Sequence, residues 1–294
     1  MTADRPVLGI SFMLGFCLLA PLGDAVAKVL GETIPLLMLL FVRFLAQAAL
    51  LWPVVWWTGQ PVRLTRRYTW LMILRTVLHI VGIGAMFTSL RYLPLADAVA
   101  IAFVMPFIML ILGKYFLGEE VGRLRLLACV VGFIGTLMVI QPSFAAVGAP
   151  ALLPLVVAVV FALFMLVTRQ VAKEVDAVNL QAQSGVIACV ILAVMAFFVP
   201  PEARFASPTS AEMWLLFAIG AVGTIAHLLM TWSLRFAPSA TLAPMQYLEI
   251  PIATAWGWLI FHDLPNGLAA AGILVTIAAG LYVIWREQRA ARAA

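Results

Sequence analysis

The sequence predicts an all-α membrane protein in which ten transmembrane helices form two inverted five-helix repeats around a central cavity, with both termini in the cytoplasm. Three observations predict this fold class. Of the 294 residues, 65% are hydrophobic and 11% are charged, whereas soluble domains are about 45 to 50% apolar and about 25% charged. The apolar residues form blocks of about 20, the length that crosses a hydrocarbon layer roughly 30 Å thick. The second half of the chain also repeats the pattern of the first.

The apolar blocks are apolar on every side, whereas the strands of a membrane barrel alternate apolar and polar residues. The spans are therefore predicted to be helices. Polar and Pro/Gly clusters separate ten of them, near 6–27, 34–57, 69–90, 95–117, 123–140, 151–168, 178–199, 211–234, 240–261 and 267–285. The first follows Arg5 as a signal peptide would, but it is longer than the 7 to 15 residues of a signal core, so we expect a span.

Basic residues lie mainly on one side of the predicted membrane. With the N-terminus inside, twelve Lys and Arg residues, Arg63 among them, fall in cytoplasmic segments, and three fall on the opposite side, at Lys28, Arg91 and Arg204. The positive-inside rule then predicts cytoplasmic termini in a bacterial-type inner membrane. The net charge of +5 forms no basic patch or stripe, so the lipid bilayer and not nucleic acid is the expected partner. The three cysteines have no metal-like spacing, and no metal or cofactor is expected.

An internal repeat appears when the chain is shifted along itself by 144 positions. Ser89-Leu90-Arg91-Tyr92-Leu93-Pro94 then falls on Ser233-Leu234-Arg235-Phe236-Ala237-Pro238, and Trp70-Leu71 falls on Trp214-Leu215. This offset predicts two units, 1–145 and 146–294. Because five spans per unit is an odd number, the units must run in opposite directions across the membrane. Inverted repeats are typical of secondary transporters, which bind substrate near mid-membrane and work by alternating access.

Two proline-containing spans carry a family resemblance. One runs from Ala98-Val99-Ala100 through Pro106 to Leu117-Gly118-Glu119, and the other from Glu249-Ile250-Pro251 through Gly257 to Phe261-His262-Asp263. With these spans the chain resembles the EamA-type branch of the drug/metabolite transporter superfamily over essentially all its length, although His262-Asp263 departs from the Gly-Glu ending of the family. By overall similarity it is most like the YddG-type exporters of aromatic and other neutral amino acids. The resemblance implies a transporter and not an enzyme.

Charged groups within spans cost about 2.5 to 3.5 kcal/mol on insertion scales, so each suggests a functional site. Arg43, with Gln47 one turn later, could bind a substrate carboxylate, or it could be structural. Glu249, the acidic residue nearest mid-depth, could pair with a substrate ammonium or be protonated in transit. It could equally hydrogen-bond backbone groups that Pro251 or Pro244 releases from the helix. Asp24 is expected near the membrane interface.

His79 and His227 differ by one helical turn on the repeat register and could face a shared cavity, where imidazole can hydrogen-bond an amino acid or carry a proton. Each could instead bond a neighbouring helix. Pro106 and Pro251 occupy matching places as hinges or fixed bends. Phe103 and Tyr247 could form an aromatic wall, with core packing as the alternative.

These features predict a monomeric secondary transporter that exports neutral, aromatic or apolar amino acids or related small metabolites by alternating access. A carrier of another metabolite or drug class is one alternative. An intramembrane enzyme is another, but no His-Glu-x-x-His or Gly-x-Ser-x-Gly motif supports it.

Overall fold

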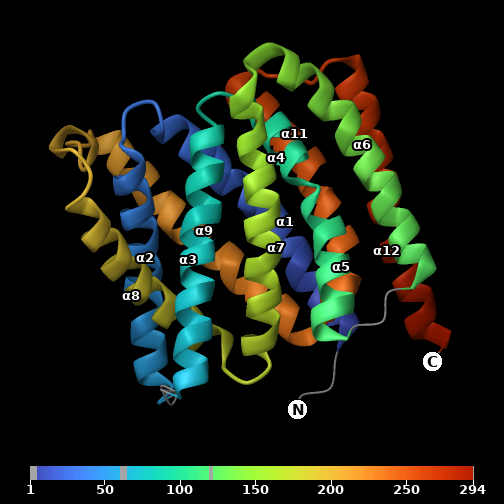
Figure 1. Cartoon of the computed structure of the whole chain (residues 1–294), viewed down its shortest axis with the longest axis horizontal. Helices are drawn as coiled ribbons and strands as arrows, with labels where there is room; N and C mark the ends of the chain where they lie inside the picture. The colour runs from blue at the N-terminus through green and yellow to red at the C-terminus, as the bar shows by residue number, and fades with distance from the viewer. Residues whose placement is uncertain (1–4, 60–64, 119–121, 294) are drawn as a thin grey trace.

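The computed structural model of the chain describes residues 5–59, 65–118 and 122–293, and all regular structure within these ranges is helical (Figure 1). Arg63 and Glu119 lie outside the described residues. The first half of the chain contains α1 (Pro6–Leu30), α2 (Leu36–Trp57), α3 (Arg66–Ser89), α4 (Leu95–Ala102), α5 (Met105–Leu117) and α6 (Arg123–Val147). The second half contains η1 (Ala149–Leu152), α7 (Leu153–Ala172), α8 (Ala177–Ala196), η2 (Pro201–Ala203), α9 (Ser210–Phe236), α10 (Ser239–Leu242), η3 (Ala243–Leu248), α11 (Glu249–Phe261) and α12 (Gly267–Ala293).

Local sequence explains where several helices begin. Pro35 and Pro94 directly precede α2 and α4; their fixed φ and missing N–H suit the residue before a helix. The Asp176 side chain accepts a hydrogen bond from the Val178 N–H at 2.9 Å and caps α8. Thr209 and Glu212 form a capping box at the start of α9, which satisfies backbone N–H groups that the helix leaves free.

Seven helical segments of the described chain are long and apolar enough to cross a membrane. They coincide with the predicted spans near 6–27, 34–57, 69–90, 95–117, 151–168, 178–199 and 211–234. The predicted spans near 123–140, 240–261 and 267–285 are also helical, but their continuous apolar helices are shorter. The chain is thus an all-helical, multi-pass membrane protein, and the number of ten spans stays a prediction.

The fourth and ninth predicted spans are each broken. Phe103 and Val104 separate α4 from α5, and η3 separates α10 from α11. Pro106 then lies in the first turn of α5 and Pro251 in the first turn of α11. A proline at those positions interrupts no helical hydrogen bond, because the first four N–H groups of a helix have no partner within it. Each proline therefore begins a new helix after a break instead of bending a continuous one.

The main helix contacts join the first half of the chain to the second. α1 packs on α9, α2 on α8, α3 on α7, α4 on α11 and α6 on α12. The start of α1 and the end of α12 lie at the same end of the bundle (Figure 1). Small residues permit the closest approaches: a Cβ added to Gly185 of α8 would lie 2.9 Å from the Ala48 backbone nitrogen of α2.

Candidate functional site

A cavity opens within the bundle, between residues of α1, α2, α3, α4, α5, α7, α9 and α11, and the empty space at this site is about 780 Å³ with the adjoining open solvent included. It lies in the half of the bundle where α1 and α3 end and where α4, α7 and α9 begin. If the termini are cytoplasmic as predicted, this is the outer half. Most of the wall is apolar and aromatic, and four ionisable side chains interrupt it: Asp24, Arg43, His227 and Glu249.

Arg43 reaches from α2 to α9 and is 2% exposed. One of its terminal nitrogens lies 2.8 Å from His227 Nδ1 and 3.4 Å from the Gly223 carbonyl oxygen. Gly223 permits this approach, since a Cβ there would lie 3.0 Å from Arg43 Nε. His227 Nδ1 also lies 3.0 Å from the Gly223 carbonyl oxygen, so its role as donor or acceptor depends on the tautomer of the ring. In either tautomer, a second ring proton would place a positive charge directly beside the Arg43 guanidinium, which is unfavourable. His227 is then a neutral imidazole, and Arg43 supplies the positive charge.

A buried amide network fixes the position of Arg43. Its second terminal nitrogen donates to Gln47 Oε1 at 3.4 Å. Gln47 Nε2 donates to the Gln181 backbone and side-chain oxygens at 2.7 and 3.1 Å, and Gln181 Nε2 donates to the His227 carbonyl oxygen and to Thr231 Oγ1, both at 2.8 Å. These bonds tie α2, α8 and α9 together. Such support holds a binding side chain in one orientation.

His79 lies behind the cavity wall and is fully buried. Its ring centre is 4.4 Å from that of His227 and 4.4 Å from that of Phe164, on which it stacks. Neither ring nitrogen has a hydrogen-bond partner within the described chain. The structure thus brings the two predicted histidines together, but only His227 lines the cavity.

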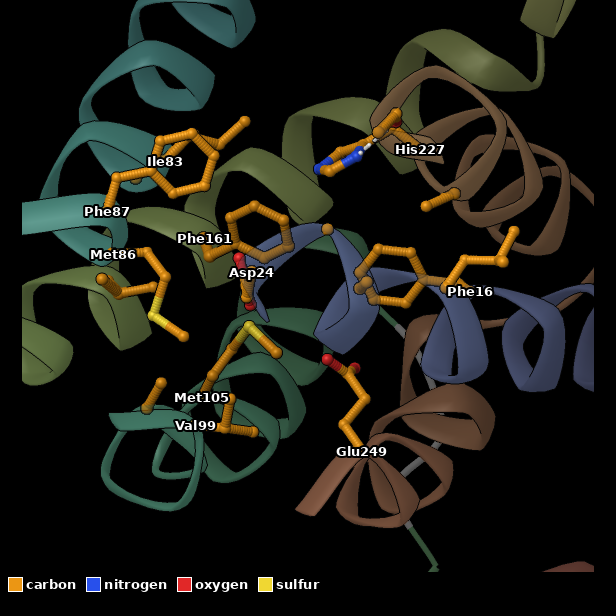
Figure 2. A pocket seen from close by; sticks show the side chains of 18 of the residues that line it. Phe16, Asp24, Ile83, Met86, Phe87, Val99, Met105, Phe161, His227 and Glu249 are labelled. Atoms are coloured by element: carbon orange, nitrogen blue, oxygen red, sulfur yellow. Dashed lines mark hydrogen bonds between the residues drawn. The ribbon is translucent and has the colours of Figure 1, made fainter. Parts of the chain in front are cut away.

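Glu249 is the first residue of α11, is 8% exposed, and points into the cavity from the side opposite α3 (Figure 2). The Cys17 thiol of α1 lies 3.8 Å from Glu249 Oε1. Asp24 of α1 also points into the cavity and is close enough to Glu249 for their charges to interact. Among the described residues, the Glu249 side chain is hydrogen-bonded to the Cys17 thiol and not to the backbone groups near Pro251.

Phe103 lines the cavity at the break between α4 and α5. Tyr247 does not; it is buried behind the wall, its ring centre 5.6 Å from that of Phe103. The Tyr247 hydroxyl donates to the Cys129 carbonyl oxygen at 3.2 Å. In this conformation Tyr247 supports Phe103 and holds η3 against α6.

Asp24 lines the cavity, a role that was not predicted for it, and its place near the membrane interface stays a prediction. Its sequence signal is its position inside the apolar block of the first span, where any charge is costly. Arg75 is a second fully buried charge that the sequence left without a role. Its Nε donates to Thr168 Oγ1 at 2.9 Å, and its guanidinium lies 4.7 Å from the centre of the Phe164 ring.

No group of three or more His, Cys, Asp or Glu side chains within the described residues could hold a metal ion. The arrangement can instead bind a small organic molecule. The aromatic wall can receive an apolar part, Arg43 can bind an anionic group, and the two carboxylates can bind a cationic one.

Comparison with known proteins adds a family and several relatives. The model of the EamA-like transporter family matches residues 7–141 and again residues 149–286. An S-adenosylmethionine uptake transporter of Rickettsia bellii is 25% identical over 96% of this chain and 95% of its own length. A riboflavin transporter of Rhizobium johnstonii is 29% identical over 76% of this chain and 73% of its own length.

A pseudopaline exporter of Pseudomonas aeruginosa is 25% identical over 87% of this chain and 88% of its own length. A solved crystal structure matches with a TM-score of 0.72, at 16% identity, over 97% of both chains. That likeness shows that the fold is one already observed.

Proposed function

This chain belongs to the EamA-like transporter family, and we propose that it is a secondary carrier that exports neutral, aromatic or apolar amino acids, or related small metabolites, by alternating access. It is a multi-pass protein of the inner membrane. What the proposal adds is the class of cargo, the direction and the mechanism.

The observation that carries the proposal is the pairing of opposite charges across an aromatic cavity. An amino acid presents a carboxylate and an ammonium a few bonds apart. Arg43 faces the cavity on one side, and Asp24 and Glu249 face it on others. The rings of Phe16, Phe103 and Phe161 are available for the side chain. Charge-assisted hydrogen bonds at both ends would orient the cargo.

The pattern of helix contacts supports alternating access. We take the sixth to tenth predicted spans as counterparts of the first to fifth. Exchanging counterparts then turns the α1–α9 pair into the α7–α3 pair and the α4–α11 pair into the α10–α5 pair, and it leaves the α2–α8 and α6–α12 pairs unchanged. That is the contact pattern of a pseudo-twofold axis. The proposed units 1–145 and 146–294 can then rock against each other, with Pro106 and Pro251 at the breaks as hinges.

The relatives support a small organic metabolite as the cargo, but they do not single out one compound. S-Adenosylmethionine, named for the Rickettsia relative, contains an amino-acid group, whereas riboflavin, named for the Rhizobium relative, does not. One relative is named for uptake and another for export. In a secondary carrier the gradients set the direction, so export is the part of the proposal that needs a separate measurement.

The test is transport by the purified full chain in proteoliposomes. Radiolabelled phenylalanine is offered with unlabelled phenylalanine inside, and liposomes without protein provide the background. We expect label to accumulate, and leucine and methionine to compete with it. If no neutral amino acid competes or accumulates while riboflavin or another metabolite of a panel does, the carrier has a different cargo class. If nothing moves, the proposal fails altogether.

A further inference from the structure

The charges that line the cavity do not balance. Asp24 and Glu249 are acidic, and Arg43 is the guanidinium that faces them. We count His227 as neutral, because a positively charged imidazole would lie 2.8 Å from the Arg43 guanidinium. With both carboxylates ionised, the cavity holds one negative charge in excess. A neutral amino acid brings one positive and one negative group and would leave that excess in place.

The excess negative charge is that of the Glu249 carboxylate. Arg43 is the cation whose charge acts on Asp24, so it partly offsets the charge of that carboxylate. The charged group that acts on Glu249 is Asp24, which repels it, and its hydrogen-bond partner is the Cys17 thiol at 3.8 Å. Among the described residues, no cation is paired with Glu249.

Neighbouring basic residues serve other groups. Lys28 is one turn beyond Asp24, but its Nζ donates to the Leu90 and Leu93 carbonyl oxygens at 3.0 and 2.6 Å. It interacts with the carboxylates of Glu32, Asp97 and Asp263 at the end of the bundle. Arg75 lies beyond His79, over the Phe164 ring. Within the described chain, neither reaches Glu249.

An ionised carboxylate that is 8% exposed is costly without a partner, by several kcal/mol even after relaxation. The cavity can avoid that cost by taking up a proton or by binding a cationic group of the cargo. The wall of the cavity that Glu249 enters favours a particular kind of cation. Phe16 and Phe103 present π-systems, and Met86 and Met105 present polarizable thioethers. Aromatic faces attract alkylated onium groups, which carry no N–H to be satisfied.

We propose that the preferred cargo is an amino-acid derivative with a second positive centre, a sulfonium or quaternary ammonium, seated between Glu249 and Asp24 while Arg43 holds the carboxylate. This inference rests on the proposed function and narrows its substrate class. Bound cargo of net charge +1 makes the site neutral, and neutral amino acids are then weaker cargo that leave Glu249 unpaired.

The test uses two probes that differ by one methyl group and one charge, methionine and S-methylmethionine. Each competes against counterflow of labelled phenylalanine in proteoliposomes of the full chain. We expect S-methylmethionine to compete at a concentration at least about tenfold lower than methionine, the ratio that corresponds to about 1.4 kcal/mol. Equal competition, or stronger competition by methionine, overturns the inference even if phenylalanine transport stands.

Two variants test whether Glu249 causes the preference for S-methylmethionine over methionine. Glu249→Gln keeps the shape of the side chain and removes its charge, so the ratio of the two competitors should fall to about one. Glu202→Gln removes an exposed carboxylate of η2 and should leave the ratio unchanged. If Glu249→Gln still binds S-methylmethionine more tightly than methionine, the preference comes from other residues. That result would contradict the proposed position of the cationic group beside Glu249. If that variant does not fold, the wild-type ratio still decides whether the cargo is cationic.

A proton is the rival source of the missing charge, and a pH-sensitive dye enclosed in the liposomes detects it. We expect transport of S-methylmethionine to leave the internal pH unchanged. A stoichiometric pH change with methionine, together with no preference for S-methylmethionine, would mean that Glu249 takes a proton and would overturn the proposal. Failure of every amino acid to move would instead refute the proposed function.

Discussion

Arg43 is the residue on which cargo orientation depends, and its substitution gives the clearest test at the residue scale. Arg43→Gln removes the positive charge from the cavity and keeps an amide for hydrogen bonding. We expect the KM for phenylalanine counterflow to rise by about tenfold or more, because a charge-assisted hydrogen bond contributes roughly 1.5 to 3 kcal/mol. Arg91→Gln is the matched control, since Arg91 is exposed and donates to the Ile34 carbonyl oxygen. A KM that is the same in both variants would make Arg43 a structural residue.

His79 keeps two ring nitrogens without partners among the described residues while fully buried. A buried polar group without a partner costs about 1 to 3 kcal/mol, so a purely structural site would favour phenylalanine. We expect His79→Phe to preserve the stack on Phe164 and to keep or raise the thermal midpoint in detergent, but to lower the transport rate several-fold. Unchanged transport with unchanged stability would show that the imidazole only packs.

The sequence anticipated part of the cavity, because charged residues in apolar spans are rare enough to stand out. Arg43, Phe103, His227 and Glu249 all line it. Depth along a span does not reveal which side of a helix faces the interior, so Asp24 was not predicted to line the cavity. For the same reason the sequence does not show that Tyr247 lies behind Phe103. That arrangement depends on how η3 packs on α6.

At the scale of elements, the helix breaks repeat with the same 144-residue offset as the sequence. Gly118 ends α5 with φ 63°, and His262 ends α11 with φ 57°. Glycine adopts this left-handed conformation freely, whereas other residues pay roughly 1 to 2 kcal/mol. His262 stands where the family has glycine, but it keeps the same left-handed backbone conformation at the end of the helix. The η3 segment was not predictable, because a proline signals a break but not the conformation that follows it.

Gly185 lets α8 approach α2 closely enough for the amide network to form. A Cβ at this position would lie 2.9 Å from the Ala48 nitrogen, whereas a Cβ on Gly84 of α3 would lie 3.5 Å from the nearest atom, Leu40 Cδ1. We expect Gly185→Ala to lower the thermal midpoint in detergent, because backbone must shift. Gly84→Ala should leave it unchanged or raise it, because alanine favours helix by about 1 kcal/mol over glycine. Equal effects would contradict the close α2–α8 contact.

For the whole molecule, composition and block length were enough to predict a helical membrane protein, because the bilayer imposes both. The boundaries were less secure where proline breaks a span or apolar character fades, as in the segments near 123–140, 240–261 and 267–285. Which half of the bundle holds the cavity could not be predicted, since that depends on how the two halves close on each other.

The predicted orientation is open to a direct test. The start of α1 and the end of α12 lie at one end of the bundle, and the distribution of basic residues assigns that end to the cytoplasm. Fluorescent-protein fusions at either terminus should be bright, and alkaline phosphatase fusions at the same points should be inactive. Active phosphatase at either terminus would reverse the topology and turn the cavity toward the cytoplasm.

The central claim is that amino-acid-like cargo crosses the membrane through the cavity between the two halves. Ala20 lines that cavity, while Leu18, two residues earlier on α1, is 56% exposed on the outside of the bundle. The most direct measurement is phenylalanine counterflow by Ala20→Trp and Leu18→Trp in proteoliposomes at equal folded yield. We predict that Ala20→Trp abolishes flux by filling the cavity and that Leu18→Trp retains it. Wild-type flux in Ala20→Trp would contradict the account.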